Sequence, residues 1–88
     1  MYKYDNIKDS LFTEKNQRLF VAVRDRVKAL LATTGAITMG QAMQLPDGIG
    51  CADSWTLMAC VDRLVELGEL TEVHRENVPG QCRVFVLT

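Results

Sequence analysis

The chain has 88 residues, of which 48% are hydrophobic and 24% charged, with a formal net charge of −1. This length allows one small domain and leaves no room for a deep substrate pocket beside a core. The composition excludes disordered and fibrous classes. No segment has the length and lack of charge of a membrane span or signal peptide, so we expect a cytoplasmic protein without membrane contact.

The charges are unevenly distributed along the chain. Residues 1–35 contain seven Lys or Arg against four Asp or Glu, whereas residues 36–88 contain three against seven. The first part is therefore basic and the second acidic. Because nucleic-acid-binding proteins usually present a basic face, this distribution bears on the choice of partner.

The cysteines show no metal-binding pattern. Cys51, Cys60 and Cys82 lack CxxC spacing, and His74 is the only histidine, so they do not form a zinc site of the usual kind. We expect reduced thiols and neither a metal nor another cofactor. A disulfide between Cys51 and Cys82 remains open, although such bonds are rare in the cytosol. A redox or metal sensor using the three thiols is a third, distant hypothesis for function.

The first twelve residues form a separate segment. They contain Tyr2, Tyr4 and Phe12 but no clear hydrophobic period. Two interpretations stay open: a disordered arm, or a short added helix used for self-association. We place the folded domain at residues 13–88.

The domain begins with a long helix. Thr13 is a suitable N-cap, and Gly35 supplies the left-handed residue that ends such a helix. Between them, apolar residues recur at helical spacing. They are Leu19, Phe20, Val23, Val27, Leu30 and Leu31.

The rest of the chain predicts four further elements. A brief strand at 36–38 precedes a short helix at 39–44, capped by Thr38, and a loop at 45–52. A third helix begins after Asp53 or Ser54 and runs to Leu67, where Gly68 ends it. Its predicted buried stripe is Leu57, Cys60, Val61, Leu64 and Leu67. Residues 70–75 and 81–87 are rich in β-formers and flank a Pro-Gly turn, which predicts a hairpin.

This order of elements resembles the winged helix-turn-helix superfamily, in particular small bacterial regulators of the MarR and PapI kind. The residues that carry the resemblance are Leu57, Val61, Leu64, Gly68 and Leu70, with the closing segment 83–88 similar to a last wing strand. The resemblance implies an α+β fold of three helices, a short strand between the first two, and a C-terminal β-hairpin wing. Such a core pattern specifies fold better than function.

The resemblance also implies a function, namely binding of double-stranded DNA by a transcriptional regulator, with a homodimer as the binding form. The third helix would lie in the major groove and the wing on the backbone. The candidate wing contacts are His74, Arg75, Asn77, Gln81 and Arg83. The candidate contacts of the third helix, to DNA or to another partner, are Trp55, Thr56, Met58, Ala59, Asp62 and Arg63.

Two departures from the family pattern support an alternative. The segment between the second and third helices is longer than the usual tight turn, and the outward face of the third helix carries Asp62 and Glu66, with Arg63 as its one typical base-reading side chain. The alternative is a winged-helix protein-interaction module that uses Trp55 and Met58 and binds no DNA.

Under the DNA hypothesis, basic residues on the first helix could contact phosphates together with the wing. They are Lys15, Arg18, Arg24, Arg26 and Lys28.

No catalytic constellation is recognisable. The sequence contains no nucleophile with a spaced base, no carboxylate pair in a typical context, and no phosphate-binding loop, because the glycines at 48 and 50 lack a surrounding βα unit. We therefore expect a binding protein and not an enzyme.

Overall fold

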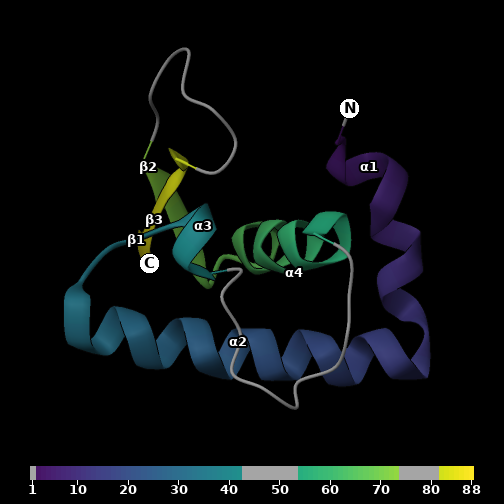
Figure 1. The fold of residues 1–88 in the computed structure, drawn as a ribbon, viewed down its shortest axis with the longest axis horizontal. Helices are drawn as coiled ribbons and strands as arrows, with labels where there is room; N and C mark the ends of the chain where they lie inside the picture. Colours follow the sequence, from purple (N-terminus) through teal and green to yellow (C-terminus); the bar gives the residue numbers. More distant parts are fainter. Residues whose placement is uncertain (1, 43–53, 74–81) are drawn as a thin grey trace.

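The computed structural model describes residues 2–42, 54–73 and 82–88, which form an α+β arrangement of helices and a three-stranded antiparallel sheet (Figure 1). The elements in chain order are α1 (Tyr4–Ile7), the 3-10 helix η1 (Lys8–Phe12), α2 (Glu14–Thr34), β1 (Ile37–Thr38), α3 (Met39–Ala42), α4 (Ser54–Glu66), β2 (Leu70–Val73) and β3 (Val84–Leu87). Figure 1 shows α2 running along one side of the molecule, with α4 above it, the sheet at one end and α1 at the other.

Helix α2 confirms the prediction for residues 13–35. The Thr13 side chain accepts a hydrogen bond from the backbone N–H of Asn16, and Gly35, at φ 80°, donates its backbone N–H to the carbonyl of Leu31. Both ends of the helix are therefore satisfied by local chemistry. Five of the six predicted stripe residues are buried, and Leu30 is half-buried.

Helix α3 begins with a reciprocal cap. The Thr38 hydroxyl accepts from the backbone N–H of Gln41, and the Gln41 side-chain oxygen accepts from the backbone N–H of Thr38. The backbone N–H of Met39 also donates to the carbonyl of Arg83, at 2.7 Å, which joins α3 to the start of β3. Met39 and Ala42 are buried, so this short helix closes one side of the core.

The sheet has the strand order β1-β3-β2, so the last strand in the sequence lies in the middle. Ile37 pairs with Phe85 across β1 and β3, and Leu70 pairs with Leu87 across β2 and β3. Ile37, Leu70 and Phe85 are buried, and they join the core that α2, α3 and α4 form. Both segments predicted as hairpin strands contain a strand, shorter than predicted, at Leu70–Val73 and Val84–Leu87, and residues 74–81 between them lie outside the described part of the chain.

The burial of α4 differs from the prediction at two positions. Cys60, Val61 and Leu64 are buried and Leu57 is half-buried, as expected, but Leu67 is 48% exposed and Ala59 is fully buried. Leu67 follows the last residue of α4, where its backbone N–H still donates to the carbonyl of Arg63, and Gly68 at φ 80° turns the chain immediately after it. Ala59 lies on the flank of Trp55 and Arg63, against which the first segment of the chain packs.

Residues 2–12 are therefore part of the same packed unit. They form α1 and η1, both of which contact α4, and Leu11 is 1% exposed within the core. The segment forms a short helix that packs on α4 of its own chain, and the self-association expected of such a helix stays a prediction. Within the described parts of the chain, no helix has the length and apolar character needed to cross a membrane.

Phe85 offers a direct test of the core. Its side chain is completely buried where the sheet meets the helices, so replacing it by Ala should lower the free energy of unfolding by about 3–5 kcal/mol through lost burial and an unfilled cavity. Urea denaturation measures this change. Phe12→Ala is the control, because Phe12 is exposed and the loss there should not exceed about 1 kcal/mol. Equal losses for the two variants would contradict the core assigned here.

Gly35 tests the end of α2. Among the described residues, no atom beyond Gly35 and its two chain neighbours lies within 4 Å of the position that a Cβ would take, so the cost of Gly35→Ala arises from φ 80°. We expect a loss of about 1–2 kcal/mol in the free energy of unfolding. Gly35→Asn should lose less, because Asn tolerates the left-handed region. An Ala variant as stable as the parent would show that α2 ends differently.

Candidate functional site on helix α4

The outward face of α4 carries charged and aromatic side chains. Trp55, Asp62, Arg63 and Glu66 are spaced by seven, eight and eleven residues, which puts them on one side of a helix. Each of these side chains contacts residues 2–12. The face predicted to meet solvent is thus partly covered by the chain's own first segment.

Tyr2 makes the first connection to this face. Its hydroxyl donates to Oδ2 of Asp62 at 2.5 Å, and its ring centroid lies 6.4 Å from that of Trp55, with the rings tilted by 60°. Burial, followed by the hydrogen bond to Asp62, raises the pKa of Tyr2 well above its ordinary value. The phenol therefore stays protonated and remains a hydrogen-bond donor throughout the neutral pH range.

Asp62 also connects α4 to the sheet. Its Oδ1 accepts from Nη2 of Arg83 at 2.7 Å, and the same guanidinium donates to both carboxylate oxygens of Glu72, at 2.7 and 3.0 Å. The side chains of Asp62 and Arg83 are only 12% and 22% exposed. The hydrogen bonds from Arg83 to Glu72 and then to Asp62 raise the pKa of the guanidinium. Arg83 is consequently engaged on two sides within the protein.

Glu66 collects three donors near the end of α4. It accepts from Nζ of Lys8 at 2.9 Å, from the Tyr4 hydroxyl at 3.1 Å, and from the guanidinium of Arg63. The hydrogen bonds from Lys8 and Arg63 lower the pKa of Glu66 to about 2. Burial and the bond to Glu66 raise the pKa of Tyr4 to about 12. The Arg63 guanidinium also lies 5.5 Å from the centroid of the Phe12 ring, a cation–π distance.

The predicted site residues are placed as follows. Trp55 is 44% exposed, as expected for an outward residue. Thr56, Met58, Asp62 and Arg63 are half-buried, and the buried Ala59 cannot make the contact predicted for it, because the first segment of the chain packs over its flank. Arg83 lies in the described part of the chain, and its side chain is paired with Asp62 and Glu72. The other predicted wing residues, His74, Arg75, Asn77 and Gln81, lie outside the described part of the chain.

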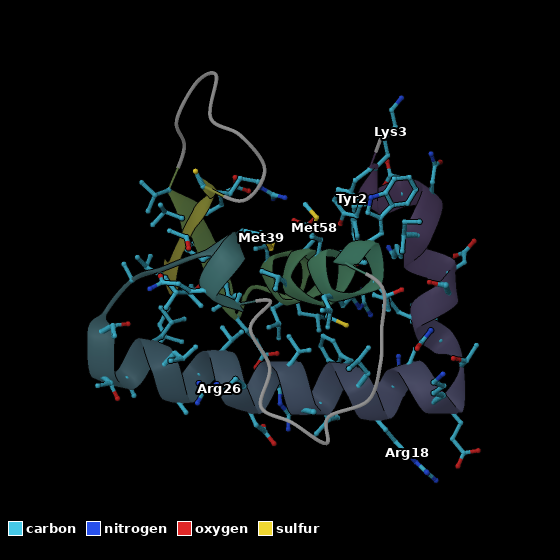
Figure 2. All side chains as sticks on the ribbon, viewed as in Figure 1. Tyr2, Lys3, Arg18, Arg26, Met39 and Met58 are labelled. Carbon is cyan, nitrogen blue, oxygen red and sulfur yellow. The ribbon has the colours of Figure 1, made fainter. Side chains whose placement is uncertain are left out.

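Of the five basic residues predicted on the first helix, Arg18 lies away from the face of α4 (Figure 2). Figure 2 shows Arg18 pointing away from α4, on the far side of α2. Three of the five are paired with acids nearby, namely Arg18 with Glu14, Arg24 with Asp25, and Lys28 with Glu69. One DNA duplex lying on α4 would therefore not also reach Arg18.

Sequence reasoning missed the four partners that complete this site, Tyr2, Tyr4, Lys8 and Glu72. The available signal was the cluster of aromatic residues in a segment without its own helical period, combined with two unexplained acids on an otherwise ordinary helix. Aromatic side chains with a polar tip are suited to covering such acids, since the ring packs while the hydroxyl donates.

Two of the three cysteines, Cys60 and Cys82, lie in the described part of the chain. Cys60 is buried, and burial raises the pKa of its thiol to about 11, which disfavours the reactive thiolate. Cys82 is exposed, and Cys51 lies outside the described residues. Within residues 2–42, 54–73 and 82–88, no group of three His, Cys, Asp or Glu side chains is placed to hold a metal ion.

The depressed pKa of Glu66 predicts a pH dependence. Because its pKa falls from 4.5 to about 2 on folding, its contribution to stability is complete above pH 4.5 and is lost as the pH falls toward 2. Glu66→Gln should therefore make the unfolding midpoint less sensitive to pH between 4.5 and 2 than it is in the parent chain. Thermal unfolding followed by circular dichroism across this range measures the difference. Parallel pH profiles for the two proteins would show that Glu66 is not held as described.

Comparison of the chain with protein-family models, with curated proteins and with solved structures gives no match. The contacts of the described residues are therefore the basis for assigning a function.

Proposed function

We propose that the chain is a winged-helix DNA-binding domain of the kind found in transcriptional regulators. Helix α4 is the element that enters the major groove, and the hairpin of β2 and β3 contacts the adjoining backbone. Two arrangements support this proposal. The order of elements from α2 to β3 follows the pattern of that superfamily, and the sheet order β1-β3-β2 brings the hairpin beside the short strand that follows α2.

The observation that carries the proposal is the internal pairing of the acids on α4. Bare carboxylates at Asp62 and Glu66 would repel phosphates, and they are the main objection to DNA in the sequence. Asp62 is paired with Arg83, which it shares with Glu72, and Glu66 is paired with Lys8 and Arg63. The face of α4 therefore presents no unpaired carboxylate, while Arg63, 26% exposed in its side chain, is the group suited to a guanine edge or a phosphate.

A second candidate function is binding of a protein partner through the same face. The observation that favours it is the exposed ring of Trp55, the one tryptophan of the chain, which lies beside Tyr2. Tryptophan is enriched among residues that dominate protein interfaces. In this case α4 would bind its partner without DNA, and a duplex would leave the domain unaffected.

A duplex titration separates the two functions. We expect a random-sequence duplex at low salt to shift the amide resonances of α4, with an affinity that falls as salt rises, since each neutralised phosphate contributes a slope of about −0.9 in log K against log salt. Arg63→Gln should weaken binding and reduce this slope by about one contact. Resonances that do not move, in a protein that stays folded, would exclude DNA and leave the protein partner.

Arg18→Gln provides the matched control for charge. It removes the same cation as Arg63→Gln, but from the side of α2 that points away from α4 (Figure 2). Its affinity for the duplex should stay close to that of the parent chain. If the two variants lose affinity equally, the duplex is bound by general charge and not by the face of α4.

A further inference from the structure

Helix α1 is attached to the molecule mainly through side chains. It has four residues, none of them buried, and its N-cap makes no side-chain hydrogen bond. A single helical turn is not stable by itself in water. The segment of residues 2–8, here named the cover segment, is tied to α4 by Tyr2 on Asp62, and by Tyr4 and Lys8 on Glu66.

The residues that follow the cover segment are fixed differently. Leu11 is buried in the core, and its carbonyl accepts from the Gln17 side chain at 2.6 Å. The carbonyl of Ser10 accepts from the Asn16 side chain at 2.7 Å. The end of η1 is therefore held on α2 by packing and by hydrogen bonds, so a movement of the cover segment pivots between Lys8 and Leu11.

The cover segment lies on the face of α4 that we assign to DNA. Its side chains contact Trp55, Asp62 and Glu66, which share that face with Arg63. Figure 1 shows α1 standing beside α4 at the end of the molecule opposite the sheet. Because a groove wall and the cover segment cannot contact the same side chains, close docking of α4 requires the segment to leave.

We propose that residues 2–8 are a displaceable cover over the DNA-binding face of α4, and that the chain binds a duplex closely only when this cover is open. The inference rests on the proposed function. The observed structure is then the closed state, and the measured dissociation constant is the intrinsic one divided by the fraction of molecules that are open.

Opening the cover does not strand a charge. Asp62 keeps its bond to Arg83, and Glu66 keeps its bond to Arg63 when Tyr2, Tyr4 and Lys8 leave. Asp62 therefore stays paired with Arg83 in the open state, and Arg63 shares its donors between Glu66 and the duplex. Opening therefore breaks two phenol hydrogen bonds, one ion pair and one ring contact, and it removes the packing of the half-buried Tyr2, Tyr4 and Ile7 against the core, while the fully buried core residues stay in place.

The test removes the phenol ties without changing any charge. The double variant Tyr2→Phe/Tyr4→Phe keeps both rings but loses the donors to Asp62 and Glu66, so a larger fraction of molecules should be open. We expect the dissociation constant for a random-sequence duplex to fall roughly three- to tenfold. Thr33→Ala is the matched control, because it removes an exposed hydroxyl that donates to the carbonyl of Ala29 within α2 without altering charge, and its affinity should not change.

Trp55 reports the opening independently of DNA. As the only tryptophan, beside the Tyr2 ring, it should emit at longer wavelength in the double variant as the cover leaves. A red shift with tighter duplex binding supports the proposal. A red shift with unchanged affinity overturns the cover and leaves DNA binding by α4 intact. No red shift shows that the phenols do not hold the segment and overturns it as well.

A chain lacking residues 2–7 gives a second, independent measurement. Since no residue of α1 is fully buried, this chain should still fold, with its helical circular dichroism lowered only by the loss of α1, and bind the duplex at least as tightly as the double variant. Affinity equal to that of the parent overturns the cover. Failure of the parent, the double variant and the shortened chain alike to bind any duplex overturns the proposed function together with the cover.

Discussion

The carboxylate of Asp62 joins three parts of the chain that are distant in sequence. It accepts from Tyr2 in the first segment and from Arg83 at the start of the last strand, while its own backbone belongs to α4. A carboxylate that is largely removed from water must have its charge and lone pairs satisfied, or the fold loses stability. The positions of α1, α4 and the sheet are therefore mutually dependent through one side chain.

This dependence explains why the outward side of α4 is polar although the chain itself partly covers it. A helix with two acids, an arginine and a tryptophan on its outward side has the composition of a surface helix, yet the side chains are used to bind the chain itself. Arg83 sits between Asp62 and Glu72 and also lies 5.3 Å from the centroid of the buried Phe85 ring. The polar network thus continues directly into the apolar core, and a change in one affects the other.

The local elements could be predicted from the sequence because their signals are local. Thr13 and Gly35 define the ends of α2 through their own backbone chemistry, and the valine and phenylalanine residues at 84–86 form a strand whose central position places Phe85 in the core. The packing of residues 2–12 could not be predicted, because it depends on contacts between residues some sixty positions apart. For the same reason, the sequence predicts that Ala59 is exposed, because none of its immediate neighbours indicates that it is buried.

Helix α2 sets the distance between the two ends of the molecule. Its 21 residues give a rod about 31 Å long, close to the longest dimension of the molecule, 32 Å. The first segment begins at one end of this rod and β1 follows the other. Inserting one residue in the middle of α2 would turn one end about the helix axis by about 100° relative to the other. Tyr2 and Arg83 could then no longer reach Asp62 together, so the contact that holds the first segment on α4 depends on the length of α2, although α2 does not make it.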